Sequence, residues 1–389
     1  MIFRFIECFV VSLKLGVTAF GGPVAHIGYF RETYVKDLKW LSEDRFAELM
    51  SLTQFIPGPA SSQLGAAIGY EKGGWLGGFG AWLGFTLPSA LAMIAFAIGM
   101  GGVQEWAGSG WLHGLKLSAV AVVMIAFLGM RKTLCPCWPE MFMAVAALVI
   151  LSMAPLAWIQ PLVILMGGVI GIFIFKEPSE AQPVEQKSGM PLGGIIMALL
   201  IFVVLLIIPL AFHDNQNAQG TGGLLRAGAL VFGGGHVVLP LLETSTVVPG
   251  LVGEDAFLAG YGAAQAVPGP LFTFGSFLGA DMQLFGSVWL GGAVGTIAIF
   301  LPGMVLLAGG LPVWNRLKHF AWARAGVKGA NAVVVGVLGA ALFGMLRGGS
   351  VQGFGDASGI VLIAFAIYFK WLPVWALVII SAVVGGIVF

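Results

Sequence analysis

Long apolar runs, interrupted at only a few places, cover most of the chain. The runs 141–154, 195–212 and 361–389 are long enough, or nearly so, to cross the roughly 30 Å hydrocarbon core of a membrane as helices. Polar residues collect between these runs instead of alternating with apolar ones, which disfavours a transmembrane barrel. The pattern therefore predicts an all-α polytopic membrane protein.

The composition agrees with a membrane protein. Of 389 residues, 58% are hydrophobic and 10% are charged, whereas a soluble domain carries roughly 25% charged residues. The formal net charge of +1 is no nucleic-acid signature. The three cysteines show no metal-binding spacing, so we expect neither a metal nor a cofactor. The N-terminal run lacks a small-residue cleavage site and contains Glu7 and Lys14, which indicates a membrane element rather than a signal peptide.

The chain also contains an internal duplication. Four blocks recur in the same order: KLGVTAFGGP from Lys14 as RAGALVFGGG from Arg226, EDRFAELMSLTQFIPGPA from Glu43 as EDAFLAGYGAAQAVPGPL from Glu254, GFTLP ending at Pro88 as AIFLP ending at Pro302, and GLKLSAVAVV from Gly114 as GVKGANAVVV from Gly326. Their separations are 226−14 = 212, 265−54 = 211, 302−88 = 214 and 328−116 = 212 residues. We predict a first repeat at 1–175, a polar linker at 176–189, an extra transmembrane helix at 190–212 and a second repeat at 213–389.

The charges of the loops indicate that the second repeat is upside down. Loop 28–45 contains four Lys or Arg residues and its counterpart 238–254 none; loop 101–113 contains none and its counterpart 311–327 three. Because basic residues favour the cytoplasmic side, this reversal predicts an inverted-topology repeat, a hallmark of secondary transporters.

Pro57, Gly58 and Pro59 interrupt an apolar region where a helix is expected, because proline ends a helix at such a position. Loop charge then requires residues 46–70 to enter and leave on the same side as a re-entrant hairpin, with one full crossing at 75–100. The alternative, a single crossing over 46–70, would leave loop 101–113 cytoplasmic without a basic residue.

The first element, residues 5–30, is expected to form a similar hairpin that turns at Gly21, Gly22 and Pro23. The N-terminus would then lie inside and the C-terminus outside.

Broken helices at membrane depth favour an anionic ligand, because helix N-termini expose N–H groups with partial positive charge. Ser61 and Ser62 follow the first break, and Thr273 follows the second break at Pro268, Gly269 and Pro270. Hydroxyl groups at a helix start bind oxyanions without adding negative charge.

Four cations recur in equivalent places, as the pairs Lys14 with Arg226 and Lys116 with Lys328. The acids Glu7 and Glu48 match no acid in the other repeat, which argues against a cation site. The alternatives are that Lys14 pairs with Glu7 or reaches the interface, and that the other three cations are interfacial anchors.

Other polar and small residues near the breaks have two readings each. Gln54 and Gln265 recur three residues before each P-G-P, where an amide can cap freed backbone or touch a ligand. His26 and His236 do not align and are either satisfied polar residues or, together with Glu48, proton-coupling groups. Glycines at the F-G-G turn of each repeat either allow close helix packing or form a turn that faces the substrate: Gly21, Gly22, Gly233 and Gly234.

Two motifs, each present in both halves, resemble the chromate ion transporter family. They are FGGPVAHIGYF from Phe20 with FGGGHVVLPLLE, and QFIPGPASSQLGAAIGY from Gln54 with AQAVPGPLFTFGSFLGA. The resemblance covers both halves and implies a full-length, two-repeat protein of the cytoplasmic membrane that exports chromate and confers chromate resistance. The family motif falls on Phe20, Gly21, Gly22, Pro23, Gln54, Pro57, Gly58 and Pro59 and on their second-half counterparts.

We thus expect a transporter, not an enzyme, whose partners are chromate and membrane lipid. Sulfate as a second substrate and a homodimer stay open, as do an importer or exchanger of sulfate or another oxyanion, a channel, and an intramembrane enzyme, for which no nucleophile–base or metal motif appears. Lys116 and Lys328 are expected as secondary anion contacts. The expected substrate site comprises Lys14, Phe20, Gly21, Gly22, Gln54, Pro57, Gly58, Pro59, Ser61, Ser62, Arg226, Gly233, Gly234, Gln265, Pro268, Gly269, Pro270 and Thr273.

Overall fold

A computed structural model describes residues 2–107, 110–153, 159–175, 192–207, 215–231, 235–311, 320–347, 351 and 353–388. Nearly all of these residues are helical, and none of them forms a strand. The predicted all-α class is confirmed. The predicted polar linker lies outside the described residues.

The first half contains two broken elements followed by three apolar helices. Its elements are α1 (Ile2–Thr18), α2 (Gly22–Phe30), η1 (Arg31–Asp37), α3 (Glu43–Phe55), α4 (Ala60–Ala107), α5 (Gly110–Leu134), α6 (Trp138–Met153) and α7 (Ile159–Ile174). The extra helix between the halves is α8 (Leu192–Ile207), which packs against α13 and α9 of the second half.

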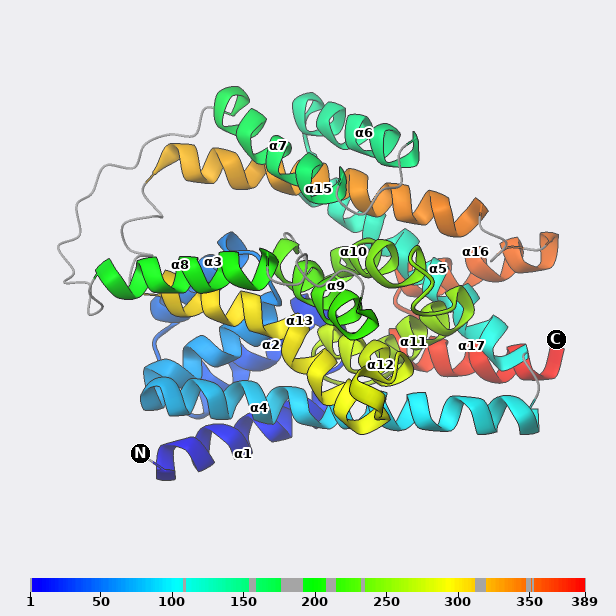
Figure 1. Ribbon diagram of the computed structural model, residues 1–389, viewed down its shortest axis with the longest axis horizontal. Helices are drawn as coiled ribbons and strands as arrows, with labels where there is room; N and C mark the ends of the chain where they lie inside the picture. Colours follow the sequence, from blue (N-terminus) through cyan, green and yellow to red (C-terminus); the bar gives the residue numbers. More distant parts are fainter. Residues whose placement is uncertain are drawn as a thin grey trace.

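The second half repeats this order. Its elements are α9 (Gln216–Leu230), η3 (Gly235–Val237), α10 (Val238–Leu242), η4 (Glu243–Val247), α11 (Glu254–Ala266), η5 (Leu271–Thr273), α12 (Phe274–Asp281), η6 (Leu284–Gly286), α13 (Val288–Gly310), α15 (Ala321–Arg347), α16 (Phe354–Tyr368) and α17 (Val374–Val388). The chain ends lie toward opposite ends of the long axis, along which α4 and α15 run on opposite sides of the molecule, with α6 and α7 outside α15 (Figure 1). Among the described helices, four are long and apolar enough to cross a membrane, at Ala60–Met100, Gly110–Leu134, Val288–Gly310 and Ala321–Arg347.

The first element is a hairpin, as its glycines predict. Gly21 and Gly22 have φ of 102° and 75°, a left-handed conformation that glycine adopts without a steric cost. The returning segment packs back on α1, where the Ser12 and Tyr34 hydroxyl groups are 2.8 Å apart. The predicted turn at this site is confirmed.

The second element is also a hairpin. α3 ends at Phe55 and α4 begins at Ala60, and α4 itself is broken at Gly73 and Gly74. Arg45 at the start of α3 forms an ion pair with Glu71, at 2.5 Å, just before that second break. Residues 46–70 therefore enter and leave at the same end of the bundle, as the loop charges predict.

The second half uses the same devices. α11 and α12 are separated by the second P-G-P, and α12 then packs antiparallel on α13, with the backbones of Gly279 and Gly291 in close contact. In the first half, Gly69 and Gly77 make the equivalent contact across the break in α4. Glycine at both positions lets two helices approach closely, which stabilises packing inside a membrane.

Candidate functional site

The two P-G-P breaks each bind the opposite half of the molecule. The backbone N–H of Gly58 donates to the carbonyl of Val231, at 2.8 Å, and the N–H of Gly269 donates to the carbonyl of Ala19, at 3.0 Å. The two bonds are equivalent by the repeat, since 58+211 = 269 and 19+212 = 231. Four helix breaks are thereby joined in reciprocal pairs at the interface between the halves.

Each P-G-P also packs on a spanning helix of the other half, just after that helix's internal proline. A Cβ on Gly58 would lie 2.9 Å from the Gly303 Cα, next to Pro302. A Cβ on Gly269 would lie 2.8 Å from the Ser89 hydroxyl, next to Pro88. Glycine is favoured at both places, because φ is 129° and 98°, and at Gly58 a Cβ would also overlap a backbone atom.

Polar groups surround the first break. Ser61 and Ser62 are buried in the first turn of α4, and the Ser62 hydroxyl has no hydrogen-bond partner among the described residues. Gln63 donates its amide N–H groups to the carbonyls of Pro57, at 3.1 Å, and Gly303, at 2.9 Å. The first N–H groups of a helix lack internal partners, so this turn presents donors to a ligand.

Sequence reasoning missed Gln63. Comparison of the repeats gives it no weight, because its counterpart is the apolar Phe274 (63+211 = 274). The sequence signal that could have identified Gln63 is its amide side chain in the first helical turn after the P-G-P break, directly after Ser61 and Ser62.

The second break is less polar. Thr273 is buried, and its hydroxyl already donates to the carbonyl of Pro270 at 2.8 Å. Phe272 and Phe274 are buried on either side of it. Gln265 contributes a buried amide nitrogen that has no hydrogen-bond partner among the described residues. The two symmetry-related breaks thus offer unequal ligands.

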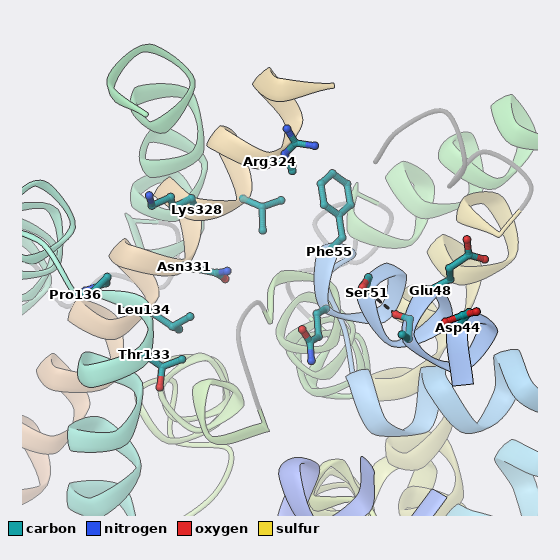
Figure 2. Close-up of a pocket in the computed structure, with 13 residues that line it drawn as sticks. Asp44, Glu48, Ser51, Phe55, Thr133, Leu134, Pro136, Arg324, Lys328 and Asn331 are labelled. Atoms are coloured by element: carbon teal, nitrogen blue, oxygen red, sulfur yellow. Dashed lines mark hydrogen bonds between the residues drawn. The ribbon is translucent and has the colours of Figure 1, made fainter. Parts of the chain in front are cut away.

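A cavity of about 690 Å³ opens beside α3 of the second hairpin and reaches Gln54, three residues before the P-G-P break at Pro57 to Pro59. Figure 2 shows Asp44 and Glu48 on the α3 side and Arg324 and Lys328 on the α15 side. Three predicted residues come together here: Gln54, Glu48 and Lys328. A second cavity, of about 660 Å³ between α4 and α13, has no charged residue in its lining and does not suit an anion.

The two cations predicted near the breaks, Lys14 and Arg226, differ in how far they are buried. Lys14 lies on the exposed face of α1, which it shares with Ile6 and Val10, and not on the face that packs against α4. Glu7 pairs with Lys72 at 3.2 Å, so the alternative that Lys14 neutralises Glu7 is wrong. Arg226 is half-buried in α9.

Lys116 and Lys328 both form ion pairs. Lys116 contacts Asp255 at 2.7 Å, and Lys328 contacts Glu140 at 3.3 Å while its ammonium lies 4.7 Å from the centre of the Phe175 ring.

His26 is fully buried, and its Nε2 lies 3.2 Å from the carbonyl oxygen of Ala19, which also accepts from Gly269. This places His26 beside the first-half break. Phe20, which precedes the turn, packs against Trp375 with ring centres 5.5 Å apart and the ring planes tilted by 41°. The predicted Gly233 and Gly234, and the side chain of His236, lie outside the described residues.

Two repeats whose broken helices meet in reciprocal pairs at their interface, with a cavity that reaches this interface region from one end, are typical of a secondary transporter. The family model described as "Chromate transporter" matches residues 6–172 and 221–386, one region in each half. The chain therefore belongs to the chromate transporter family.

Curated relatives cover most of the chain. An uncharacterised transporter of Methanocaldococcus jannaschii is 26% identical over 98% of this chain and 94% of its own length. The chromate transport protein of Pseudomonas aeruginosa is 27% identical over 86% of this chain and 79% of its own length. The probable chromate transport protein of Synechococcus elongatus is 26% identical over 96% of this chain and 93% of its own length. No solved structure matches the chain.

Proposed function

We propose that this protein is a secondary transporter that exports chromate across the cytoplasmic membrane and thereby confers chromate resistance. The observation that carries the proposal is the reciprocal pair of hydrogen bonds between the P-G-P breaks and the opposite halves. Broken helices joined across two inverted repeats provide a binding site whose walls belong to both moving parts. Membership of the chromate transporter family supports chromate as the substrate, as do the names of the Pseudomonas aeruginosa and Synechococcus elongatus relatives.

The oxyanion would bind at the first break. The start of α4 supplies backbone N–H groups, and Ser62 supplies a buried hydroxyl without a partner among the described residues. Gln265 would supply an amide from the second half. Lys14 and Arg226, five residues before the breaks at Ala19 and Val231, would contribute positive charge along α1 and α9 without direct contact.

The cavity beside α3 would admit the anion from the cytoplasm. Arg324 and Lys328 would attract the anion along the α15 wall, opposite Asp44 and Glu48 on the α3 wall, and Gln54 leads from the cavity to the break. An inside-negative potential favours anion exit by about 2.3 kcal/mol per charge per 100 mV, or about 4.6 kcal/mol for a dianion, so export needs no second ion. Exchange for another ion or proton coupling through His26, His236 or Glu48 is an additional hypothesis.

Inverted membrane vesicles test the proposal. With an inside-positive potential, vesicles that contain the chain should take up radiolabelled chromate faster than vesicles from the same cells without it, and cells that express the chain should grow at higher chromate concentrations. Sulfate offered in parallel gives the contrast: sulfate uptake without chromate uptake would make the protein a transporter of a different oxyanion. Equal chromate uptake with and without the chain would overturn the proposal.

A further inference from the structure

The two ends of the molecule are not in the same state, although the repeats are equivalent. By the repeat, α3 corresponds to α11 (254−43 = 211) and α5 to α15 (326−114 = 212). α11 packs against α5 and α17, whereas α3 packs mainly on α4 and faces α15 across the cavity (Figure 2). A molecule with strict two-fold symmetry would show the same contacts at both ends.

The end at α11 is closed. Leu112 and Leu115 of α5, Ala259 of α11 and Val378 of α17 form one buried cluster. Beside it, Lys116 of α5 pairs with Asp255 at the start of α11, with Nζ and Oδ1 2.7 Å apart. An apolar cluster and an ion pair thus hold the hairpin against the spanning helix.

The end at α3 is open, and the same positions face each other across the cavity. Asp44 is the counterpart of Asp255 (44+211 = 255), and Lys328 is the counterpart of Lys116 (116+212 = 328). Both line the cavity, from opposite walls. The other facing positions are complementary too, since Ala259 corresponds to Glu48 and Leu112 to Arg324, a pair of opposite charge.

Each lysine has a second acid within its own group of helices. Lys328 contacts Glu140, the third residue of α6, with Nζ and Oε1 3.3 Å apart. Asp356 is likewise the third residue of α16, the helix that follows α15 as α6 follows α5, and it is held by Nε2 of His113 at 2.9 Å. At the open end Lys328 is therefore paired with Glu140 of the neighbouring helix α6. At the closed end Lys116 is paired with Asp255 of the hairpin helix α11.

We infer that Lys116 and Lys328 are gate residues that exchange acid partners when the transporter changes the side to which it is open. The inference rests on the proposed transport by alternating access. In the state seen here, Lys116–Asp255 closes one end and Lys328–Glu140 leaves the other open. In the alternate state Lys328 binds Asp44, α3 closes on α15, and Lys116 moves to Asp356. Each lysine thus has an acid partner in both states, as an element with two stable arrangements requires.

Cysteine cross-linking in the full-length protein tests the exchange. Cys8 and Cys135 are buried and only Cys137 is exposed, so Cys137→Ser provides an unreactive background. The pair Ser51→Cys on α3 with Val327→Cys on α15, both in the cavity lining, leaves Asp44 and Lys328 in place and, treated with a short bifunctional thiol reagent, reports closure of the α3 end. We expect slow cross-linking in this background and a rate about tenfold higher when Asp255→Asn removes the ion pair of the α11 end. The matched control is Glu254→Gln, the neighbouring acid, which should leave the rate unchanged.

A second variant guards against a folding defect. Lys328→Arg keeps a cation that can bind either acid, and should retain more transport than Lys328→Gln. Equal cross-linking rates with Asp255→Asn and Glu254→Gln would overturn the inference, as would a Lys328→Arg variant no better than Lys328→Gln. Cross-linking requires no substrate, so its outcome does not depend on whether the chain transports chromate. A protein that cross-links as expected but moves no chromate would refute the proposed substrate and leave the gate intact.

Discussion

Replacing Gly58 with alanine tests whether the reciprocal contact between the halves holds the site together. The φ of 129° at Gly58 disfavours any L side chain, at about 1–2 kcal/mol. The added Cβ would also lie 2.9 Å from the Cα of Gly303, a backbone atom that cannot rotate away. Overpacking of this kind costs about 1–3 kcal/mol, and weakening the hydrogen bond to Val231 adds about 0.5–1.5 kcal/mol. We expect Gly58→Ala to destabilise the protein by about 3–6 kcal/mol.

The equivalent substitution Gly269→Ala should be milder. Its Cβ meets the Ser89 hydroxyl at 2.8 Å first, while the carbonyl oxygens of Gly16 and Phe85 are 3.3 Å away. A side chain can move, so part of this cost is removable. The counterpart of Ser89 is Gly303 (89+214 = 303), and Ser89→Gly should therefore restore part of the stability of Gly269→Ala.

Thermal unfolding in detergent and chromate flux in vesicles measure both effects. The midpoint for Gly58→Ala should fall by about 5 °C or more, and flux should fall with it. The control is Gly99→Ala, a helical position with no atom within 4 Å of the new Cβ, which should be neutral or slightly stabilising. A Gly58→Ala protein with the stability and flux of the control would refute the argument that this glycine is needed at the interface.

Three further substitutions separate ligand groups from structural ones. Ser62→Ala should leave thermal stability unchanged or raised, because the buried hydroxyl has no partner among the described residues, while chromate affinity should fall about 5–10-fold. The control is Ser381→Ala, whose hydroxyl donates within α17, and this variant should bind chromate with unchanged affinity. Arg45→Met should lower stability by about 1 kcal/mol, measured by thermal unfolding, since it releases Glu71 from the end of the hairpin; unchanged stability would argue against this tie. Lys14→Gln should lower chromate flux in vesicles without lowering the amount of folded protein, and wild-type flux would remove Lys14 from the proposed charge balance.

The sequence by itself determined the class of protein and the plan of its repeats. Hydropathy, the reversed loop charges and the chemistry of proline and glycine act locally, within a few residues of where they are read. They therefore predict the helices and the breaks at Gly21 and at Pro57 to Pro59, which the structure shows, and the inversion of the second repeat, which stays a prediction. The breaks have a structural consequence, because an interrupted helix leaves backbone N–H and C=O groups that need hydrogen-bond partners inside a membrane.

Only the tertiary structure decided how those breaks are satisfied and which side chains surround them. The bond from Gly58 to Val231 joins residues that no periodicity connects, and the amide of Gln63 reaches Gly303 of the other half. Lys14 faces outward because α1 packs through its opposite face, a choice that the composition of α1 does not reveal. The repeat predicts two equal ends, and only packing makes them unequal, because one molecule can close α11 while α3 stays open.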